Sequence, residues 1–276
     1  MAHFYSKDDT DQLNRTSPHS ASAVTSGSQP RFSKRRKFLQ MAVRGAVAGL
    51  VTPAGMELVT PSSVQAQTTL TPRMALRELM EGNKRFVAVN LTSFEQDLAI
   101  LRNHTSELQQ PFAAVLACAD SRVPVELIFD QSIGQIFVTR VAGNITTSEI
   151  IASLEYGAAV LGAKVILVMG HGDCGAIKAA IKGGEVPGQI SALYPHLQPA
   201  INREGPDPDP DATAKANAKI QAGLLRKAST VISGLVKEGK LLVRPAFYNI
   251  ASGEVSLLRP FDADSLQDPS DSDNSG

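Results

Sequence analysis

The sequence predicts an α/β protein built around a mainly parallel sheet. Two short apolar runs bounded by polar residues, at positions 136–140 and 165–169, have the composition of buried strands. Between them, residues 148–161 repeat apolar side chains at the spacing of a helix. A strand, a helix and a strand in this order indicate a parallel pair of strands joined by a helical crossover.

The first elements of this fold lie upstream of the crossover. Thr71 followed by Pro72 predicts the start of a helix, because Pro is favoured just inside a helix N-terminus, and Gly82 should weaken this helix slightly. Its apolar positions are Met74, Leu76, Leu79, Met80 and Phe86. A second helix is expected at residues 94–108, and a buried strand at residues 112–118.

The last elements follow the crossover. Residues 203–211 are rich in Pro and Asp, which predicts a loop, and a long helix is expected after it at 212–238. Residues 241–248 and 254–258 have the composition of two strands, and the short segment 251–253 between them indicates a hairpin.

Composition limits the possible functions. The 276 residues suffice for one domain of about 200 residues with terminal extensions. The hydrophobic core of a domain of this size is stable without disulfide cross-links. Lys and Arg balance Asp and Glu at 27 each, so no net field draws the chain to nucleic acid or to an anionic membrane. The expected partner is therefore a small molecule.

The N-terminal segment has the order of features found in a signal peptide. Residues 1–30 are polar with no periodic apolar face, and we expect them to be disordered. The basic cluster 34–37, the apolar run 41–51 and small residues at Val64 and Ala66 then follow in the order that a signal peptidase substrate requires. The pair Arg35-Arg36 resembles a twin-arginine signal, which predicts export to the periplasm and cleavage near Ala66.

Three other interpretations of this segment stay open: an uncleaved tether, a plain basic tail and a transmembrane anchor. The anchor is disfavoured because Arg44, Pro53 and Glu57 interrupt an apolar run that is shorter than the roughly 20 residues a bilayer needs. No stable membrane span is therefore expected after processing. The chain divides into a leader at 1–66, a folded domain at 67–260 and an acidic tail, expected to be disordered, at 261–276.

Two of the expected strands end in clusters of metal-binding residue types. Cys118 ends the strand at 112–118 and is followed by Asp120 and Arg122, and His171 and Cys174 follow the strand at 165–169. Ligands gather at the carboxyl ends of parallel strands, so the clusters converge if these strands lie side by side. Two thiolates and an imidazole suit zinc and leave a fourth position for water or substrate.

Cys118 and Cys174 also have simpler interpretations. Either can be a buried structural residue, and export favours a disulfide between them. Transport of a folded protein with zinc loaded beforehand would instead keep both as thiolates. Glycines that flank His171 and Cys174 would let the backbone turn tightly, so that both side chains face one ion.

Asp120 and Arg122 are two residues apart and can form a charge-assisted pair in a turn. An ordinary surface ion pair would have no part in any chemistry. Beside a metal, Asp120 can accept a hydrogen bond from bound water or, if Arg122 releases it, occupy the open coordination position itself. The first arrangement supports catalysis and the second blocks it.

Four motifs occur in order along the chain: Cys118-Ala-Asp120-Ser-Arg122-Val123-Pro124, Arg140-Val-Ala-Gly-Asn144, Glu155-Tyr156 and Gly170-His171-Gly-Asp-Cys174-Gly175. Together they resemble the beta-class carbonic anhydrases over residues 71–258. The resemblance implies a parallel four-stranded sheet with a fifth strand at its edge, flanked by helices, in homodimers or larger assemblies built from dimers. It also implies a lyase activity, in which a zinc-bound hydroxide attacks carbon dioxide to give bicarbonate and a proton.

The same resemblance implies a role for each site residue. One zinc per chain would be held by Cys118, His171 and Cys174, with Asp120 and Arg122 as the catalytic pair. Four residues would line the carbon dioxide pocket at a dimer interface: Gln109, Phe137, Ala142 and Tyr156. Gln110, adjacent to Gln109, is the alternative to it.

The chain departs from the family pattern at two positions, and other functions stay open. Bicarbonate-regulated members have Trp and Gly where this chain has Val115 and Ala117, so the resemblance does not extend to a regulated closed state. A hydrolase of carbonyl sulfide or carbon disulfide would use the same metal site. Two alternatives are not enzymes. One is an exported module that binds zinc or an anion, and the other is a structural domain that is stabilised by a disulfide and holds no metal.

Overall fold

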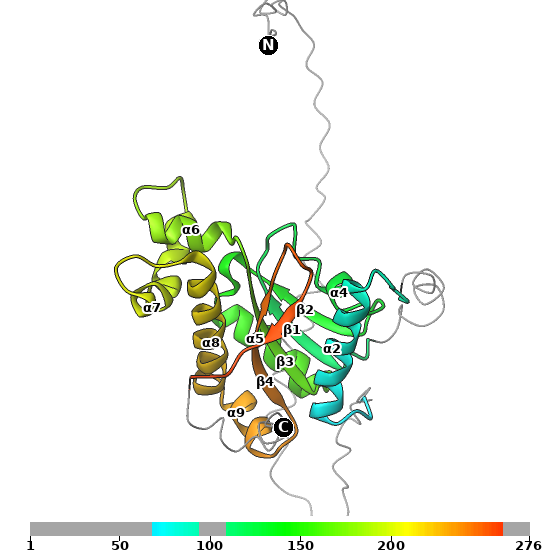
Figure 1. Cartoon of the computed structure of the whole chain (residues 1–276). Coiled ribbons are helices and arrows are strands. Elements are labelled where there is room, and N and C mark those ends of the chain that lie inside the picture. Colours follow the sequence, from blue (N-terminus) through cyan, green and yellow to red (C-terminus); the bar gives the residue numbers. More distant parts are fainter. Residues whose placement is uncertain (1–67, 94–108, 262–276) are drawn as a thin grey trace, which may run out of the picture. The chain divides into compact units, whose positions relative to one another are not determined.

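The computed structural model describes residues 68–93 and 109–261, all of them within the unit Thr60–Gly276. Its centre is a five-stranded sheet with the strand order β2-β1-β3-β4-β5 (Figure 1). The first four strands in this order are parallel, and β5 is antiparallel at the edge, which confirms the predicted fold class. The strands are β1 (Ala113–Ala117), β2 (Ile136–Arg140), β3 (Val165–His171), β4 (Leu242–Tyr248) and β5 (Val255–Leu257).

The crossover predicted between residues 136–140 and 165–169 joins parallel strands that do not pair with each other. β1 lies between β2 and β3 and pairs with both. All five residues of β1 are apolar and buried, whereas β2 ends in the exposed Arg140. The wholly apolar strand therefore occupies the inner position, and the more polar strand lies at the edge.

Alternate residues of the strands bury two separate cores, one on each face of the sheet. On one face, Val115, Leu167 and Met169 pack against Ala75 and Leu79 of α2 (Pro72–Val87). α4 (Val125–Ile128) covers the same face. On the other face, side chains of β1 and β3 pack against α5 (Ser148–Glu155), α8 (Pro210–Ala228) and α9 (Thr230–Lys237). Each face thus receives its own helical layer, as a parallel sheet requires.

The structure explains why position 82 in the middle of α2 is a glycine, which the sequence alone does not. α2 begins at Pro72 with the Thr71 hydroxyl as its N-cap, as predicted. A Cβ at position 82 would lie 1.7 Å from the carbonyl oxygen of Phe129. The lower helix propensity of Gly82 is therefore outweighed by the close approach of α2 to the chain after α4.

The C-terminal half contains more helices than predicted. The expected helix 212–238 is two helices, α8 and α9, which meet at Ser229. The Ser229 hydroxyl accepts a hydrogen bond from the backbone N–H of Ile232 and donates one to Glu155, so this break is stabilised by a helix cap. α7 (Tyr194–Glu204) overlaps the start of the expected loop, and α6 (Gly175–Lys182) was not predicted.

Other predicted elements are confirmed with small changes. β4 and β5 form the predicted antiparallel pair. The crossover helix is α5 up to Glu155, and a π-helical turn, Tyr156–Val160, completes it. The helix expected at 94–108 lies outside the described residues. Within those residues, none of the helices combines the length and the hydropathy needed to cross a bilayer.

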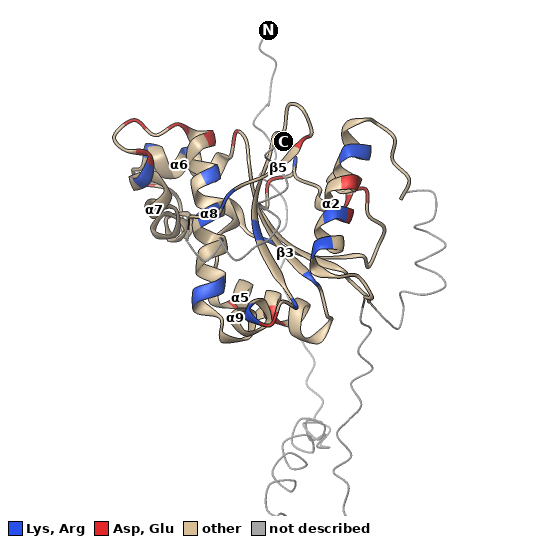
Figure 2. Ribbon diagram, turned by 60° about the horizontal axis from the view of Figure 1, so that its bottom comes forward, with Lys and Arg blue, Asp and Glu red and all other residues tan. Residues whose placement is uncertain are grey.

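Charge is distributed as the balanced composition indicates. Acidic and basic residues lie side by side on exposed helix surfaces, as on α2 (Figure 2). On that helix Glu81 pairs with Lys84 at 2.8 Å, one turn apart.

Candidate metal centre

Cys118, His171 and Cys174 come together at the carboxyl edge of the sheet. Cys118 directly follows β1, and His171 is the last residue of β3, the strand that pairs with β1. Cys174 lies three residues further on and is the N-cap of α6. The adjacency of β1 and β3 is what brings the two sequence clusters together, as predicted.

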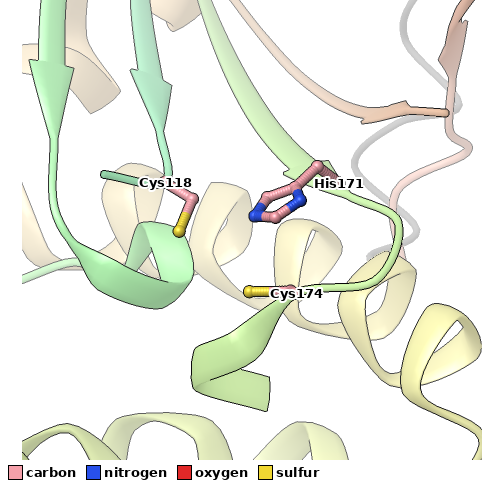
Figure 3. A group of neighbouring side chains, drawn as sticks. All are labelled: Cys118, His171 and Cys174. Atoms are coloured by element: carbon pink, nitrogen blue, oxygen red, sulfur yellow. The ribbon is translucent and has the colours of Figure 1, made fainter. Parts of the chain in front are cut away.

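The three side chains point toward one another (Figure 3). They are 4%, 1% and 1% exposed, and their ligand atoms all lie within 4.8 Å of one another. Both cysteines are free thiols in this arrangement, so the structure contains no disulfide between them. Two sulfurs and one imidazole nitrogen at this spacing match a zinc site with one open position.

The His171 ring presents a nitrogen that fits a metal. Its Nδ1 lies 2.8 Å from the carbonyl oxygen of Gly172, which assigns the ring proton to Nδ1 and the lone pair to Nε2. Nε2 is buried and has no hydrogen-bond partner among the described residues. An unsatisfied acceptor beside two buried sulfurs is unfavourable without an ion, so the donor set fits zinc.

The cluster also favours ionisation of one thiol. The pKa of Cys118 is lowered to about 4, first by the hydrogen bond from Cys174 and also by the backbone N–H of Gly143, which lies 3.3 Å from Cys118 Sγ. The pKa of Cys174 is raised because its proton is shared with Cys118. A bound cation would replace that shared proton and hold both sulfurs as thiolates.

The turn between His171 and Cys174 differs from the predicted one. The residue with positive φ is Asp173, at 54°, and not a glycine. Gly170 is required instead by packing, because a Cβ there would lie 2.7 Å from the carbonyl oxygen of Ala214 on α8. Asp is one of the few residues that adopt this left-handed conformation at modest cost.

Asp120 and Arg122 form the pair that their spacing predicts. Arg122 Nε lies 3.0 Å from Asp120 Oδ1, Nη2 lies 2.8 Å from Oδ2, and the Arg122 backbone N–H also donates to Oδ1. This forked interaction holds the pKa of Asp120 well below its usual range and raises that of Arg122. Asp120 Oδ2 lies 3.9 Å from His171 Nε2, so the ionised carboxylate borders the cluster.

Arg140 is a site residue whose role the sequence did not show, although it belongs to one of the four motifs. Its Nε donates to the carbonyl oxygen of Cys118 at 2.9 Å, and its Nη2 donates to the carbonyl oxygen of Asp120. One guanidinium at the end of β2 thus fixes the backbone that carries both Cys118 and Asp120.

α8 supports the site from behind with two fully buried amides that sequence reasoning missed. Asn217 Nδ2 donates to the carbonyl oxygen of Gly143 at 2.8 Å, and Gln221 Oε1 accepts from the Thr146 backbone N–H at 2.8 Å. These bonds hold the loop whose Gly143 N–H reaches Cys118. Polar residues four apart on a helix usually mark a solvated face, so the sequence held no signal for this role.

The four residues assigned to the substrate pocket are distributed over several elements. Phe137 on β2 and Tyr156, the first residue of the π-helical turn after α5, have ring centroids 6.3 Å apart, and Ala142 precedes the Gly143 that contacts Cys118. Gln109 is exposed ahead of β1. Their part in substrate binding stays a prediction.

Comparison with known proteins agrees with this geometry. The carbonic anhydrase family profile matches residues 113–255. A carbonic anhydrase of Mycolicibacterium smegmatis is 33% identical over 192 residues, which cover 67% of this chain and 93% of that relative. Carbonic anhydrase 2 of Mycobacterium tuberculosis is 33% identical over 195 residues, which cover 67% of this chain and 92% of that relative.

Solved structures show the same fold. A beta-carbonic anhydrase of Coccomyxa in complex with acetazolamide has a TM-score of 0.52 at 26% identity, over 66% of this chain and 86% of that one. A beta-carbonic anhydrase of Aspergillus fumigatus has a TM-score of 0.56 at 22% identity, over 69% of this chain and 94% of that one. Motifs, sheet topology and the buried Cys-His-Cys cluster agree with these matches: the chain belongs to the carbonic anhydrase family, in its beta class, and is a zinc-dependent lyase that hydrates carbon dioxide.

Proposed function

We propose that Cys118, His171 and Cys174 hold the zinc of this reaction and that Asp120 and Arg122 are its catalytic pair. The observation that carries the proposal is the convergence of three buried ligand atoms, one of them the unsatisfied Nε2 of His171, beside the ionised carboxylate of Asp120. When bound, the metal lowers the pKa of a coordinated water, less so than at a site of three neutral imidazoles because two thiolates offset its charge.

Asp120 acts in this scheme as a hydrogen-bond acceptor. Its lowered pKa keeps it ionised at neutral and alkaline pH, so it offers only lone pairs to the reacting water. A carboxylate fixed in this way orients the water and leaves the oxygen free to attack carbon dioxide. Arg122 keeps the carboxylate at the border of the cluster by donating to both of its oxygens, and Oδ2, which accepts one such bond, retains a lone pair for the water.

The backbone around the ligands is fixed before any substrate arrives. Arg140 holds the carbonyl groups of Cys118 and Asp120, and Asn217 holds the loop that donates to Cys118. Such prior fixation reduces the reorganisation needed during the reaction.

Metal analysis together with an activity assay tests the proposal. The purified protein should contain about one zinc per chain and should hydrate carbon dioxide in a stopped-flow assay with an indicator dye. Cys118→Ser, His171→Ala and Cys174→Ser should each remove the zinc and the activity together. A metal-free wild-type protein with a Cys118–Cys174 disulfide would contradict the whole assignment.

We also propose that the chain forms a homodimer, or an assembly built from dimers, through the face that carries Tyr156. β2 is an edge strand, and beside it Tyr156 and Val160 on the π-helical turn are 47% and 51% exposed. A structural relative from Sordaria macrospora, matched at a TM-score of 0.53 and 22% identity, is tetrameric. Exposed apolar side chains at a sheet edge favour association.

Light scattering tests this interface. The wild type should have the mass of a dimer or a larger assembly, and Val160→Asp should have a smaller mass. Equal masses would contradict this interface.

Export by the twin-arginine route is the proposal for the leader, which lies outside the described residues. It is supported by Arg35-Arg36, the apolar run behind them and the small residues at Val64 and Ala66. The family match to 113–255 lies within the domain proposed at 67–260. N-terminal sequencing of periplasmic protein should find a start near Gln67, and Arg35→Lys with Arg36→Lys should leave the precursor inside the cell. An intact N-terminus on cytoplasmic protein as the normal state would refute export.

A further inference from the structure

Asp173 is a charged residue that the proposed mechanism does not use. It lies between the ligands His171 and Cys174 in the loop after β3, and its side chain is 57% exposed. An exposed side chain at such a position is usually free to move. This one pairs with Arg122 and Lys178, and the backbone N–H of the same residue donates a hydrogen bond to Asp211.

The contact with Arg122 links the two loops that carry the site. Arg122 Nη1 lies 3.0 Å from Asp173 Oδ2, and Nη2 donates to the Asp173 carbonyl oxygen at 3.1 Å. The same guanidinium donates to both carboxylate oxygens of Asp120. Arg122 is thus held between the loop after β1 and the loop after β3.

Asp173 is itself fixed by its surroundings. Its backbone has a φ of 54°, and its N–H donates to Asp211 Oδ1 at 2.9 Å, in the first turn of α8. Its second carboxylate oxygen forms an ion pair with Lys178 on α6. A non-glycine residue held in the left-handed region by several contacts is typical of a functional loop.

A fixed partner for Arg122 matters because Arg122 is 44% exposed. A long side chain in solvent gains rotamer entropy by leaving its partner. Asp120 Oδ2 lies only 3.9 Å from His171 Nε2, so a released carboxylate needs a small rotation to reach a metal at the cluster. Coordination by Asp120 would fill the position that water needs.

We propose that Asp173 is a positioning residue for the reaction: it fixes Arg122, and through Arg122 it keeps Asp120 out of the open coordination position. The inference rests on the proposed roles of Asp120 and Arg122. It assigns a function to a residue of the His171–Cys174 loop that is not a ligand.

The first experiment separates the carboxylate of Asp173 from its backbone conformation. Glycine favours positive φ, so Asp173→Gly keeps the loop conformation without strain, while it removes the carboxylate that Arg122 contacts and leaves the hydrogen bond from Arg122 to the backbone carbonyl. We expect unchanged zinc content, an unchanged or higher melting temperature, and a roughly fivefold lower kcat/KM, the scale of one exposed ion pair. Asp173→Asn should change activity in the same direction. Wild-type kcat/KM in Asp173→Gly would overturn the proposal.

A matched control removes a similar charge elsewhere. Glu81 on α2 is an exposed carboxylate paired with a lysine, as Asp173 is, but it lies in a different element from the site residues. Glu81→Gln should retain wild-type kcat/KM. A loss in Glu81→Gln equal to that in Asp173→Asn would show a general effect of surface charge and would contradict the specific role.

The second experiment tests whether Asp173 acts through Asp120. In an Asp120→Ala background there is no carboxylate to hold away, so adding Asp173→Gly should cause no further loss of kcat/KM. A full additional loss would overturn the proposed route. Wild-type activity of Asp120→Ala alone would instead refute the catalytic pair, which is a separate result.

A spectroscopic measurement gives a readout that is independent of turnover. With cobalt in place of zinc, the visible spectrum of the wild type should change with pH as a water molecule in the open coordination position loses its proton. In Asp173→Gly the Asp120 carboxylate should occupy the open coordination position in a fraction of the molecules. Those molecules have no water to lose a proton, so the amplitude of the pH-dependent change should fall. An amplitude equal to that of the wild type would contradict displacement of Asp120.

Discussion

Asp120 and Asp130 are buried or partly buried aspartates that each pair with an arginine, and of the two only Asp120 borders the candidate metal centre. Asp130, after α4, has a fully buried side chain that accepts hydrogen bonds from Arg85, Thr92 and Ser93. Asp120 is 16% exposed, and its hydrogen-bond donors among the described residues all belong to Arg122.

The electrostatics of the two aspartates are similar, but their surroundings differ. Hydrogen bonding to Arg122 lowers the pKa of Asp120, while at Asp130 burial acts to raise the pKa and the bonds from Arg85, Thr92 and Ser93 outweigh it. A lowered pKa beside an arginine therefore does not identify a catalytic carboxylate. The two differ in acceptor capacity: Asp120 Oδ2 accepts a single hydrogen bond from the described residues and lies 3.9 Å from His171 Nε2, whereas both oxygens of Asp130 accept at least two.

The largest expected effect is on activity at Asp120. Asp120→Ala should keep its zinc, because three ligands remain, and should lose about 10²-fold or more in kcat/KM through the missing acceptor. Its unfolding free energy should change little, since the Asp120 pair is partly exposed. Stopped-flow hydration assays, metal analysis and urea unfolding measure the three quantities. Wild-type rates over pH 7 to 9 would show that Asp120 has no catalytic role.

The converse effect is expected at Asp130. Asp130→Ala leaves several buried donors without an acceptor and should lower the unfolding free energy by about 3 kcal/mol. The folded, zinc-loaded variant should retain wild-type kcat/KM at 25 °C. Urea unfolding followed by circular dichroism provides the measurement; an unchanged midpoint would mean that the buried network contributes nothing.

Acid should remove the stabilisation from Asp130. Its folded pKa lies below the unfolded value of about 3.9, so the contribution is complete above about pH 5 and decreases as the pH falls through 4 and below. The difference in unfolding free energy between the wild type and Asp130→Asn should therefore shrink from pH 6 to pH 3. Both proteins lose zinc in acid, so the difference isolates Asp130. A constant difference would contradict the lowered pKa.

The smallest effects are expected when lysine replaces each arginine, because lysine keeps the charge but not the forked geometry. Arg85→Lys should lower the unfolding free energy by about 1 kcal/mol without affecting kcat/KM. Arg122→Lys should lower kcat/KM and leave unfolding nearly unchanged. Identical patterns for the two variants would remove the distinction between the regions.

The sequence reveals the chemistry of the metal centre because that chemistry depends on residue type. Cys118, His171 and Cys174 indicate zinc through their donor atoms, and the two-residue spacing of Asp120 and Arg122 indicates their pairing. The positions of the inner strands followed in the same way from apolar composition, since β1 and β3 are buried throughout.

The parts that sequence reasoning missed depend on distant contacts. Gly82 is explained only by the carbonyl group of Phe129, and the break between α8 and α9 is stabilised at Ser229 by a bond to Glu155. Likewise, the buried amides of Asn217 and Gln221 acquire a role only because α8 packs behind the loop at Gly143. No local pattern encodes such contacts.

The sequence by itself predicted which residues would form the metal site, which carboxylate would lie beside them and which segments form strands, because donor chemistry and hydrophobic periodicity are local properties. Tertiary structure alone decided that β1 lies between β2 and β3, and so brought Cys118 beside His171. It also decided that Asp173 meets Arg122, since that contact joins loops 51 residues apart in the chain. Packing on the two faces of the sheet fixes these positions. This packing consists of contacts between segments that are distant in the chain, so no single segment contains the information.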